Sequence, residues 1–543
     1  MSGTSVFAPL RIRTFRSLWI ANVASNFGGL IQGVGAAWLM TSISESAAMV
    51  ALVQASITLP VMLFSLMSGA VADSFDRRRV MLSAQIFMAL VSVSLAAVAW
   101  LGLITPWLLL MFTFLIGCGV AFNNPAWQAS VGDIVPRQEL TSAVLLNSAS
   151  FNVTRSVGPA LGGAIVVAAG AAAAFMVNTI SYLGLIIVLW RWKPERVPSS
   201  LPRERLTAAM TTGIRYVALS PGILRVLMRG FVFGFTTVVI LALLPLVARH
   251  LVQGNALVYG MLLGAFGVGA VLGALTSNRL RERIANELLV RMTFVAFSVC
   301  AITVAFSSSV LITSAALILG GVAWVIALSL LNTTVQLSAP RWVVGRALSL
   351  YQMAIFGGMA LGSWLWGSIA EASSLESALL LAAAGMLLGV LVGYRVPLLS
   401  NEVLNLDPLN RWKEPAVALA IEPRNGPIAI SIEHGISPAQ TDEFLEVMTE
   451  RRRIRRRDGA LDWTLSQDLA DPTRWFEHFE VPTWLDYVRF HTRTTQADAH
   501  ISDRILSLQI DSAPPRVRRM LEWKGGAVRL GPAEGDVDTL IAS

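Results

Sequence analysis

A glycine, an aspartate and three arginines stand close together in a chain that is otherwise poor in charge. The set consists of Gly69, Asp73, Arg77, Arg78 and Arg79. Glycine allows two helices to approach closely, and the Asp73 carboxylate can lie near a helix N-terminus or pair with an arginine. Such contacts can form in one conformation and break in another. We therefore expect a gating loop; the alternative is that the arginines only fix the orientation of the chain in a membrane.

Arg155 stands about halfway along an apolar stretch, where a charged side chain is costly. An arginine at the centre of a membrane helix costs about 2.5–3.5 kcal/mol. We therefore expect Arg155 to face a cavity and mark a substrate or ion pathway, unless it makes a purely structural polar contact. Six amides in similar stretches are assigned to the same pathway, although such amides more often bond neighbouring helices. They are Asn22, Asn26, Asn123, Asn152, Asn332 and Gln336.

Small residues follow Arg155 on the same apolar stretch. The set Gly158, Pro159, Gly162 and Gly163 gives a smooth, kinkable helix face on which another helix can lie and rock. Simple close packing of two helices is compatible with that role.

Residues for catalysis or metal binding are not recognisable. The C-terminal histidines fit no metal-ligand spacing, and the glycine-rich phosphate loop of ATP-driven pumps does not occur. We expect no catalytic residue, no metal and no cofactor. The net charge of +8 does not indicate nucleic acid, because in a membrane protein the location of basic residues matters more than their total.

The composition indicates that lipid surrounds most of the chain. Hydrophobic residues make up 55% and charged residues 14%, against about 25% charged in a typical soluble protein; the mean hydropathy is +0.62. Apolar stretches of about 20 residues, each long enough to cross a bilayer, predict twelve helices, the first retained rather than cleaved. They cover 18–40, 50–71, 80–103, 107–126, 143–168, 171–190, 223–247, 258–277, 288–306, 310–331, 348–369 and 377–394.

Basic residues orient these helices. They gather at the N-terminus and in every second loop, whereas Arg249 is the one basic residue in the opposite loops. Positive loops stay in the cytoplasm, so we expect both termini on the cytoplasmic side of a bacterial inner membrane.

The two halves repeat at an offset of 204 residues. Gly69-Ala70 recurs as Gly273-Ala274, and Gly158 recurs as Gly362. Arg155 has Met359 as its counterpart, so its charge is not required by the scaffold. The expected organisation is an N-terminal six-helix half at 1–190, a cytoplasmic linker at 191–221 and a C-terminal half at 222–396, related by an axis along the membrane normal.

These motifs carry a family resemblance. The loop from Gly69 to Arg79 resembles the signature of the major facilitator superfamily, with Asp76 where the family usually has glycine. The Gly158–Gly163 stretch resembles the helix-5 motif of drug:proton antiporters. The longer set Phe122–Trp127, Val135–Arg137 and Asn147–Asn152 is similar to the enterobactin-exporter-like branch, also called the transmembrane secretion effector family.

The resemblance implies a secondary active transporter with the major facilitator fold. It implies export of a small molecule, such as a siderophore or drug, by alternating access. Protons are the coupling ion that the resemblance suggests, with Asp73 or Asp133 as candidate carriers, because no carboxylate lies well inside a predicted span. The alternative is a non-transporting, membrane-anchored sensor or a cytoplasmic enzyme that modifies a small molecule.

The C-terminal region reads as a separate domain. Residues 397–427 form a polar, proline-containing linker, and 428–510 predict strands at 428–433, 460–468 and 474–481 with helices at 438–456 and 484–508. This order is typical of a ferredoxin-like α+β fold and resembles the antibiotic-biosynthesis-monooxygenase-like domain, which implies pairing into a homodimer. The domain is either an enzyme or a dimerisation and regulatory module. Residues 511–543 are expected to be mostly disordered.

Overall fold

The protein is described by a computed structural model for residues 7–136, 138–193, 206–398, 405–407, 409, 415, 417–510 and 515–522. The chain divides into two compact units. The helical unit comprises Met1–Ile214, Gly222–Leu337 and Val344–Glu402. The C-terminal unit comprises Val403–Ser543 together with two short connectors, Arg215–Pro221 and Ser338–Val343.

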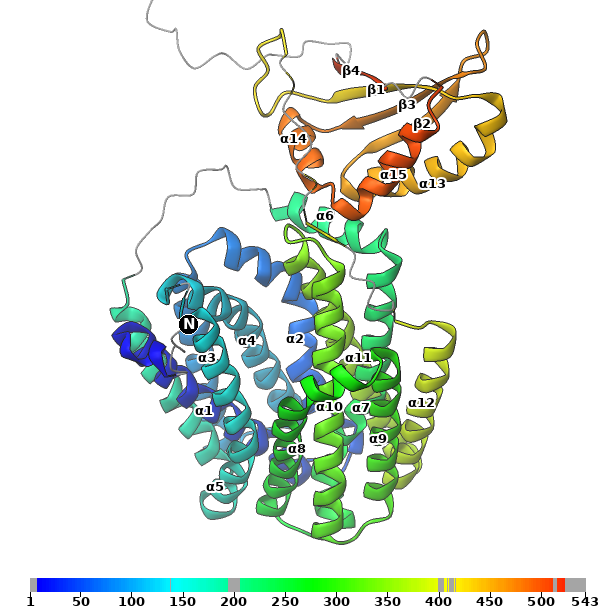
Figure 1. Ribbon diagram of the computed structural model, residues 1–543. Helices are drawn as coiled ribbons and strands as arrows, with labels where there is room; N and C mark the ends of the chain where they lie inside the picture. Colours follow the sequence, from blue (N-terminus) through cyan, green and yellow to red (C-terminus); the bar gives the residue numbers. More distant parts are fainter. Residues whose placement is uncertain are drawn as a thin grey trace, which may run out of the picture. The chain divides into compact units, whose positions relative to one another are not determined.

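Long apolar helices build the helical unit (Figure 1). Within the described residues, ten helices are long and apolar enough to cross a membrane. The elements are η1 (Ala8–Arg11), α1 (Arg13–Ile43), α2 (Ala47–Ser74), α3 (Arg77–Trp100), α4 (Pro106–Ile134), α5 (Leu140–Arg191), α6 (Leu206–Ala218), α7 (Pro221–Leu246), the π-helical turn η2 (Val247–Leu251), α8 (Ala256–Arg283), α9 (Asn286–Phe306), α10 (Val310–Ser338), α11 (Val344–Ala372) and α12 (Leu375–Arg395). The expected linker at 191–221 therefore contains a helix, α6.

The 52-residue α5 is two helices that reverse direction at Gly170. Gly170 has φ 79°, a left-handed conformation that glycine adopts without strain. Both segments of α5 lie along α1. Before Gly170, a Cβ on Gly162 would meet Ile31 and Val34 of α1. After Gly170, Ala174 and Phe175 lie where a Cβ on Gly35 of α1 would be. Further along, a Cβ on Gly28 would meet Asn178 and Ser181, so the second segment runs back along α1. The expected boundary between spans at 168–171 coincides with this break.

The two halves use their repeated glycines in the same way. Gly158 of α5 lies against Leu30 of α1, and its counterpart in α11, Gly362, lies against Phe235 of α7. Gly358, one turn before Gly362, also lies against α7. A Cβ on Gly358 would meet the Phe231 backbone oxygen. Residues that correspond at the 204-residue offset therefore also make equivalent helix contacts in the two halves.

The two halves contact each other along two pairs of helices, α5 with α8 and α2 with α11, which we call seams. At both seams the backbones come very close. Along α5 and α8, a Cβ on Gly260 would meet the Pro159 oxygen and lie 3.2 Å from the Gly163 Cα. Along α2 and α11, a Cβ on Gly367 would lie 2.6 Å from the Ala51 Cβ and 3.0 Å from the Ala48 Cα. Glycine is needed at these positions because backbone atoms occupy the space of a side chain.

The C-terminal unit is a four-stranded antiparallel sheet covered by helices. Figure 1 shows α13 and α15 running along the sheet. The strand order is β2-β3-β1-β4. The elements are β1 (Ile428–Gly435), η3 (Pro438–Gln440), α13 (Thr441–Asp458), β2 (Leu461–Gln467), β3 (Arg474–Val481), α14 (Trp484–Arg493), α15 (Gln496–Ser507) and β4 (Arg516–Leu521).

Two expectations for this unit need correction. The helix expected at 484–508 is two helices, because Thr495 starts α15 with a capping box in which it and Asp498 satisfy each other's backbone N–H groups. Residues Arg516–Leu521, placed in a stretch expected to be disordered, form β4 and pair with β1. Sequence alone misses β4 because its side chains are mostly exposed and three of its six residues are arginines. The residues after 522 lie outside the described part.

A buried charge cluster lies between α13 and the sheet. Glu477 of β3 is fully buried and accepts hydrogen bonds from Arg451 Nε (3.4 Å), Arg455 Nε (3.1 Å) and Trp463 Nε1 (3.0 Å). Burial alone would raise the pKa of this carboxyl, but the two guanidiniums and hydrogen bonds from His434 and Trp463 hold it well below its ordinary value. Glu477 is therefore ionised at neutral pH and links α13 to the centre of the sheet.

We expect Gly260→Ala to destabilise the helical unit by about 1–3 kcal/mol, because a methyl group there forces α8 away from the α5 backbone. Thermal unfolding of the purified protein in detergent measures this change. Gly184→Ala in α5, where a Cβ would meet nothing within 4 Å, is the control and should be neutral or slightly stabilising. Equal melting temperatures for the two variants would contradict the proposed backbone contact.

We expect Glu477→Gln to destabilise the C-terminal unit by about 3–5 kcal/mol at pH 7, because it leaves two buried guanidiniums without their counter-charge. The lowered pKa means that the stabilisation is present at neutral pH and is lost as pH falls below the ordinary carboxyl range of about 4.5. The difference from wild type should therefore shrink in acid. Pulse proteolysis in urea at several pH values measures it, with Glu480→Gln on the same strand as control.

Candidate functional site

The predicted gating arginines hold the ends of neighbouring helices together in the N-terminal half. Arg77, the first residue of α3, donates through Nη1 to the Ala129 oxygen (2.9 Å) and to Asp133 Oδ2 (2.7 Å) of α4. Its Nε also reaches the Ala72 oxygen of α2 at 3.4 Å. One side chain therefore joins α2, α3 and α4.

The next two arginines differ in their contacts. Arg78 donates to the Leu189 (2.8 Å) and Trp190 (2.7 Å) oxygens at the C-terminal end of α5, where a cation is favoured by the helix dipole. The Arg79 side chain is exposed, and its backbone N–H is accepted by Asp76 Oδ1 at 3.2 Å. Asp76, which replaces the glycine usual in the resembling loop, is thus the N-cap of α3.

Gly69 lies on the seam between α2 and α11. A Cβ at this position would lie 3.3 Å from Ser349 Oγ of α11. One turn earlier in α2, Ser65 Oγ donates to the Ser349 oxygen at 3.1 Å. Asp73 belongs to the last turn of α2, and its side chain lies outside the described part of the structure. The loop sequence therefore continues a contact between the two halves.

Arg155 lies at the other seam, between α5 and α8. Its guanidinium carbon is 5.4 Å from the centre of the Phe266 ring of α8, and a Cβ on Gly267 would meet the Arg155 and Ser156 backbone. Among the described residues it makes no hydrogen bond or ion pair, and its side chain is partly exposed. A guanidinium with free donors at the junction of two halves can bind an anion or a polar group.

Among the described residues, the predicted pathway amides do not form one hydrogen-bonded cluster. Asn123 is buried and accepts from Gln85 Nε2 at 3.1 Å, which joins α3 to α4. Gln336 Nε2 donates to Asn332 Oδ1 at 2.5 Å within α10. Asn22 is buried in α1, and Asn26 and Asn152 are partly exposed in α1 and α5.

A buried polar network was missed by sequence reasoning. Gln32 Oε1 of α1 accepts from Ser92 Oγ (2.9 Å) and Asn178 Nδ2 (2.5 Å), and Asn178 continues to the Tyr182 hydroxyl (3.1 Å). Thr179 donates to Ser92 at 3.0 Å. Gln32 is recognisable in the sequence as a polar residue in an apolar stretch. Its partners lie on α3 and α5, and the sequence does not indicate which residues of other helices it contacts.

A charged cluster in the C-terminal half was also missed. Arg229 of α7 is fully buried and donates to Glu287 of α9 (3.1 Å) and to the Val396 oxygen (3.2 Å). Arg291 shares Glu287 at 2.7 Å, and Glu287 also accepts from the Leu398 N–H at 2.9 Å. The cluster fixes the exit of the chain from α12. The sequence feature that could have indicated this cluster is the occurrence of Arg229, Glu287 and Arg291 near the ends of predicted apolar stretches.

The halves also meet at the opposite end of α2. Glu371, near the end of α11, accepts from Ser46 Oγ and from the Ala48 N–H (3.1 Å), at the first turn of α2. Arg249 donates to the Thr41 oxygen in the last turn of α1. A carboxylate thus lies at a helix N-terminus and a guanidinium at a helix C-terminus, as the helix dipole favours.

Within the described residues, no three His, Cys, Asp or Glu side chains lie close enough to hold a metal ion. The described site consists of helix seams, helix-end charges and one guanidinium without polar partners.

Comparisons with known proteins agree with this description. A family model described as "Transmembrane secretion effector" matches residues 4–525. The enterobactin exporter EntS of Salmonella choleraesuis is 26% identical over 399 residues, which cover 70% of this chain and 92% of that protein. The multidrug efflux pump Tap of Mycolicibacterium fortuitum is 26% identical over 415 residues, covering 72% and 97%.

A solved structure of an auto-inhibited POT family peptide transporter shares the fold of the helical unit. It has a TM-score of 0.58 at 13% identity and covers 72% of this chain and 98% of that one. The family model spans nearly the whole chain, and the helices and their seams fit it. The protein therefore belongs to the transmembrane secretion effector family of major facilitator transporters and is a transporter rather than an enzyme.

Proposed function

We propose that this protein exports a small molecule across the bacterial inner membrane by alternating access. The observation that carries the proposal is the pair of glycine-rich seams, α5 with α8 and α2 with α11, by which two repeated halves touch. Backbones that meet without interlocking side chains can rock or slide at little steric cost. A transport path between the halves would then open alternately to each side.

The proposal includes twelve membrane spans with both termini in the cytoplasm. Ten helices have the length and hydropathy of a span. Reversal at Gly170 divides α5 into two spans, and α1, which is not among the ten, has 31 residues and the length of a span. The distribution of basic residues gives the orientation.

The substrate class follows from Arg155. A partly exposed guanidinium beside Phe266 and without polar partners among the described residues would attract an anionic or polar compound with an aromatic part. Because the relative EntS is an enterobactin exporter and the relative Tap is a multidrug efflux pump, a siderophore is one candidate and a drug is another. Arg155 favours the siderophore, because many siderophores carry ionisable oxygen groups.

Gating and coupling are assigned to the loop between α2 and α3. We infer that Gly69, Asp73 and the Arg77–Arg79 cluster stabilise one access state and release it in the other. Proton coupling is part of the same proposal, with Asp73 as candidate carrier. Asp133 is a weaker candidate, because its carboxylate is 2.7 Å from Arg77 and proton uptake would break that ion pair.

The test begins with the substrate. Mass spectrometry of cells with and without the protein identifies a compound that accumulates inside when the protein is absent. Transport of that compound into everted membrane vesicles, with and without a proton gradient, then measures export. If no compound accumulates and everted vesicles show no gradient-dependent uptake of siderophores or drugs, the proposed function is wrong.

We expect Arg155→Gln to lower uptake of the identified compound into everted vesicles at least about tenfold, because a charge-assisted contact to the substrate is lost. The matched control is Arg395→Gln, an exposed arginine at the end of α12, which should transport at the wild-type rate. Wild-type uptake by Arg155→Gln in membranes with normal expression would remove Arg155 from the transport path.

We further propose that the C-terminal unit has a ferredoxin-like fold and regulates transport. The order β-α-β-β-α-β with strand order β2-β3-β1-β4 supports the fold. The regulatory role is supported by contacts with the two connectors that belong to this unit. The Arg457 guanidinium lies 5.1 Å from the Tyr216 ring centre, and that of Arg493 lies 4.5 Å from the Trp342 ring centre.

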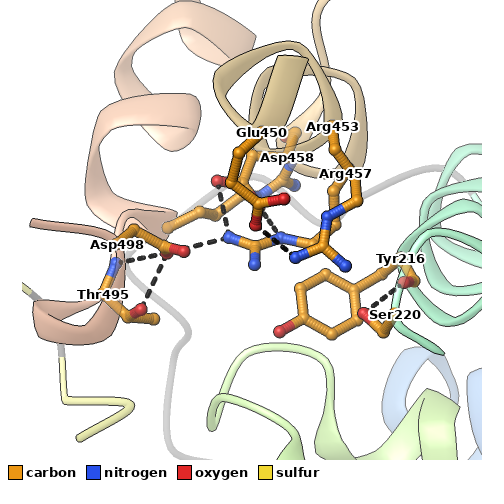
Figure 2. A network of polar contacts seen from close by, with 9 residues as sticks. Tyr216, Ser220, Glu450, Arg453, Arg457, Asp458, Thr495 and Asp498 are labelled. Carbon is orange, nitrogen blue, oxygen red and sulfur yellow. Dashed lines mark hydrogen bonds and ion pairs between the residues drawn. The ribbon is translucent and has the colours of Figure 1, made fainter. Parts of the chain in front are cut away.

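Figure 2 shows the residues around the contact between Arg457 and Tyr216. Arg457 donates to both oxygens of Asp458 (2.8 and 3.1 Å) and to Asp498 (2.8 Å), and Asp498 also accepts from Thr495. Burial raises the pKa of Asp458 to about 6, while Arg457 opposes the shift. An arginine with fixed orientation loses little entropy on meeting Tyr216. Homodimerisation through this unit stays a prediction.

We expect Arg493→Gln to loosen the connectors, because it removes the contact with Trp342 and a 3.0 Å hydrogen bond to the Asp458 oxygen. Hydrogen–deuterium exchange of the full chain should show faster exchange in Ser338–Val343, and the transport rate should change. Arg489→Gln on the same helix, whose pair with Asp486 is long at 3.7 Å, is the control. Unchanged exchange and unchanged transport in Arg493→Gln would contradict the regulatory role.

A further inference from the structure

A cavity of about 290 Å³ opens among the helices of the C-terminal unit. Its walls come from α13, α14 and α15, and its size is at the lower end of the range for small-molecule sites. The apolar part of the wall is formed by Ile454, Phe490 and Ile501, and the charged part by Arg451 and Arg455. It is therefore an apolar pocket with guanidiniums on one side.

The two guanidiniums are only partly satisfied. Both share the single carboxylate of Glu477, through Nε in each case, and Arg451 Nη1 donates to Ser502 Oγ at 3.0 Å. Arg451 Nη2 and both Nη atoms of Arg455 have no hydrogen-bond partner in the described chain. Arg455 is 8% exposed as a residue, but its Nη atoms are not fully enclosed by protein. These donors are therefore accessible from the cavity that Arg455 lines.

Aromatic rings fix the orientation of Arg455. Its guanidinium carbon lies 4.8 Å from the Phe479 ring centre and 5.2 Å from the Phe490 ring centre. The two ring centres are 5.5 Å apart, so the guanidinium lies against both rings, and this contact restricts its orientation. The free donors are thus presented within a restricted range of directions.

The charged groups around the cavity fall into two sets on different sides. Asp458 and Asp498 line it, but both are paired with Arg457. Burial, with Arg455, Arg519 and Arg451 nearby, lowers the pKa of His491 to about 3, so this ring is neutral. Arg451 and Arg455 share the single carboxylate of Glu477, so positive charge is in excess on their side of the cavity. On the other side, Asp458 and Asp498 share the single charge of Arg457.

We propose that this cavity binds a small organic monocarboxylate with an apolar, ring-sized body. The carboxylate accepts hydrogen bonds from the free Nη groups of Arg455 and Arg451, as carboxylates do from guanidinium edges. The apolar body packs against Ile454, Phe490 and Ile501. The site lies entirely in the C-terminal unit, and its occupancy does not depend on the proposed transport or regulation.

Benzoate is the probe, added to the full-length protein in detergent and followed by isothermal titration calorimetry. We expect saturable binding of benzoate at one site, and binding of benzyl alcohol and benzylamine at least about tenfold weaker. Arg455→Gln should weaken benzoate binding at least about tenfold. Arg456→Gln, the exposed neighbour on the same helix with the same change in charge, should bind as wild type does.

Ile501→Trp fills the cavity while leaving the pair of Glu477 with Arg451 and Arg455 in place, and it should abolish binding in a protein that still unfolds cooperatively. Arg155→Gln separates this site from the transport path and should leave benzoate binding unchanged. The proposal is overturned if wild type does not bind benzoate, if benzyl alcohol binds equally well, or if Ile501→Trp binds as wild type does. Loss of binding in Arg155→Gln instead of Arg455→Gln would also overturn it.

Discussion

Direct contact between the backbones of α5 and α8, and of α2 and α11, is the constraint on which the helical unit depends. Atoms of one helix occupy the space where a side chain on the other would stand, so the sequence must supply glycine or alanine at these positions. In a bilayer, where apolar side chains gain little by leaving lipid for protein, close packing becomes a main source of helix association. The seams therefore hold the halves together through close backbone contact, with few side-chain contacts such as Ser65 with Ser349 across them.

Charged groups are placed where this packing ends. Arg78 meets the last oxygens of α5, Arg249 meets an oxygen in the last turn of α1, and Glu371 meets the first turn of α2. At these points unpaired backbone groups and the helix dipole stabilise a charge that the apolar interior would not accept. Arg155 differs from these residues, since it lies within a helix and its guanidinium contacts the Phe266 ring.

The C-terminal unit uses one helix for two purposes. Along α13, Arg451 and Arg455 point to the Glu477 carboxylate and the cavity, whereas Arg457 points to Asp458, Asp498 and Tyr216. Within this run of arginines, Arg452 and Arg456 are exposed, whereas Arg451 and Arg455 contact Glu477 and Arg457 contacts the connector residue Tyr216.

The sequence by itself determined the membrane class, the repeat, the positions of the long helices and the three strands between 428 and 481. These follow from local hydropathy and alternation, which need no knowledge of neighbours. The helix ends are less exact, since α4 ends at Ile134, eight residues beyond the predicted end at 126. Tertiary structure decided the rest: the reversal at Gly170 seen through α1, the pairing of β4 with β1, the Gln32 network, and Arg229 with Glu287. Each joins residues far apart in the chain, and a side chain's partner across such a distance is fixed by packing rather than by its sequence neighbours.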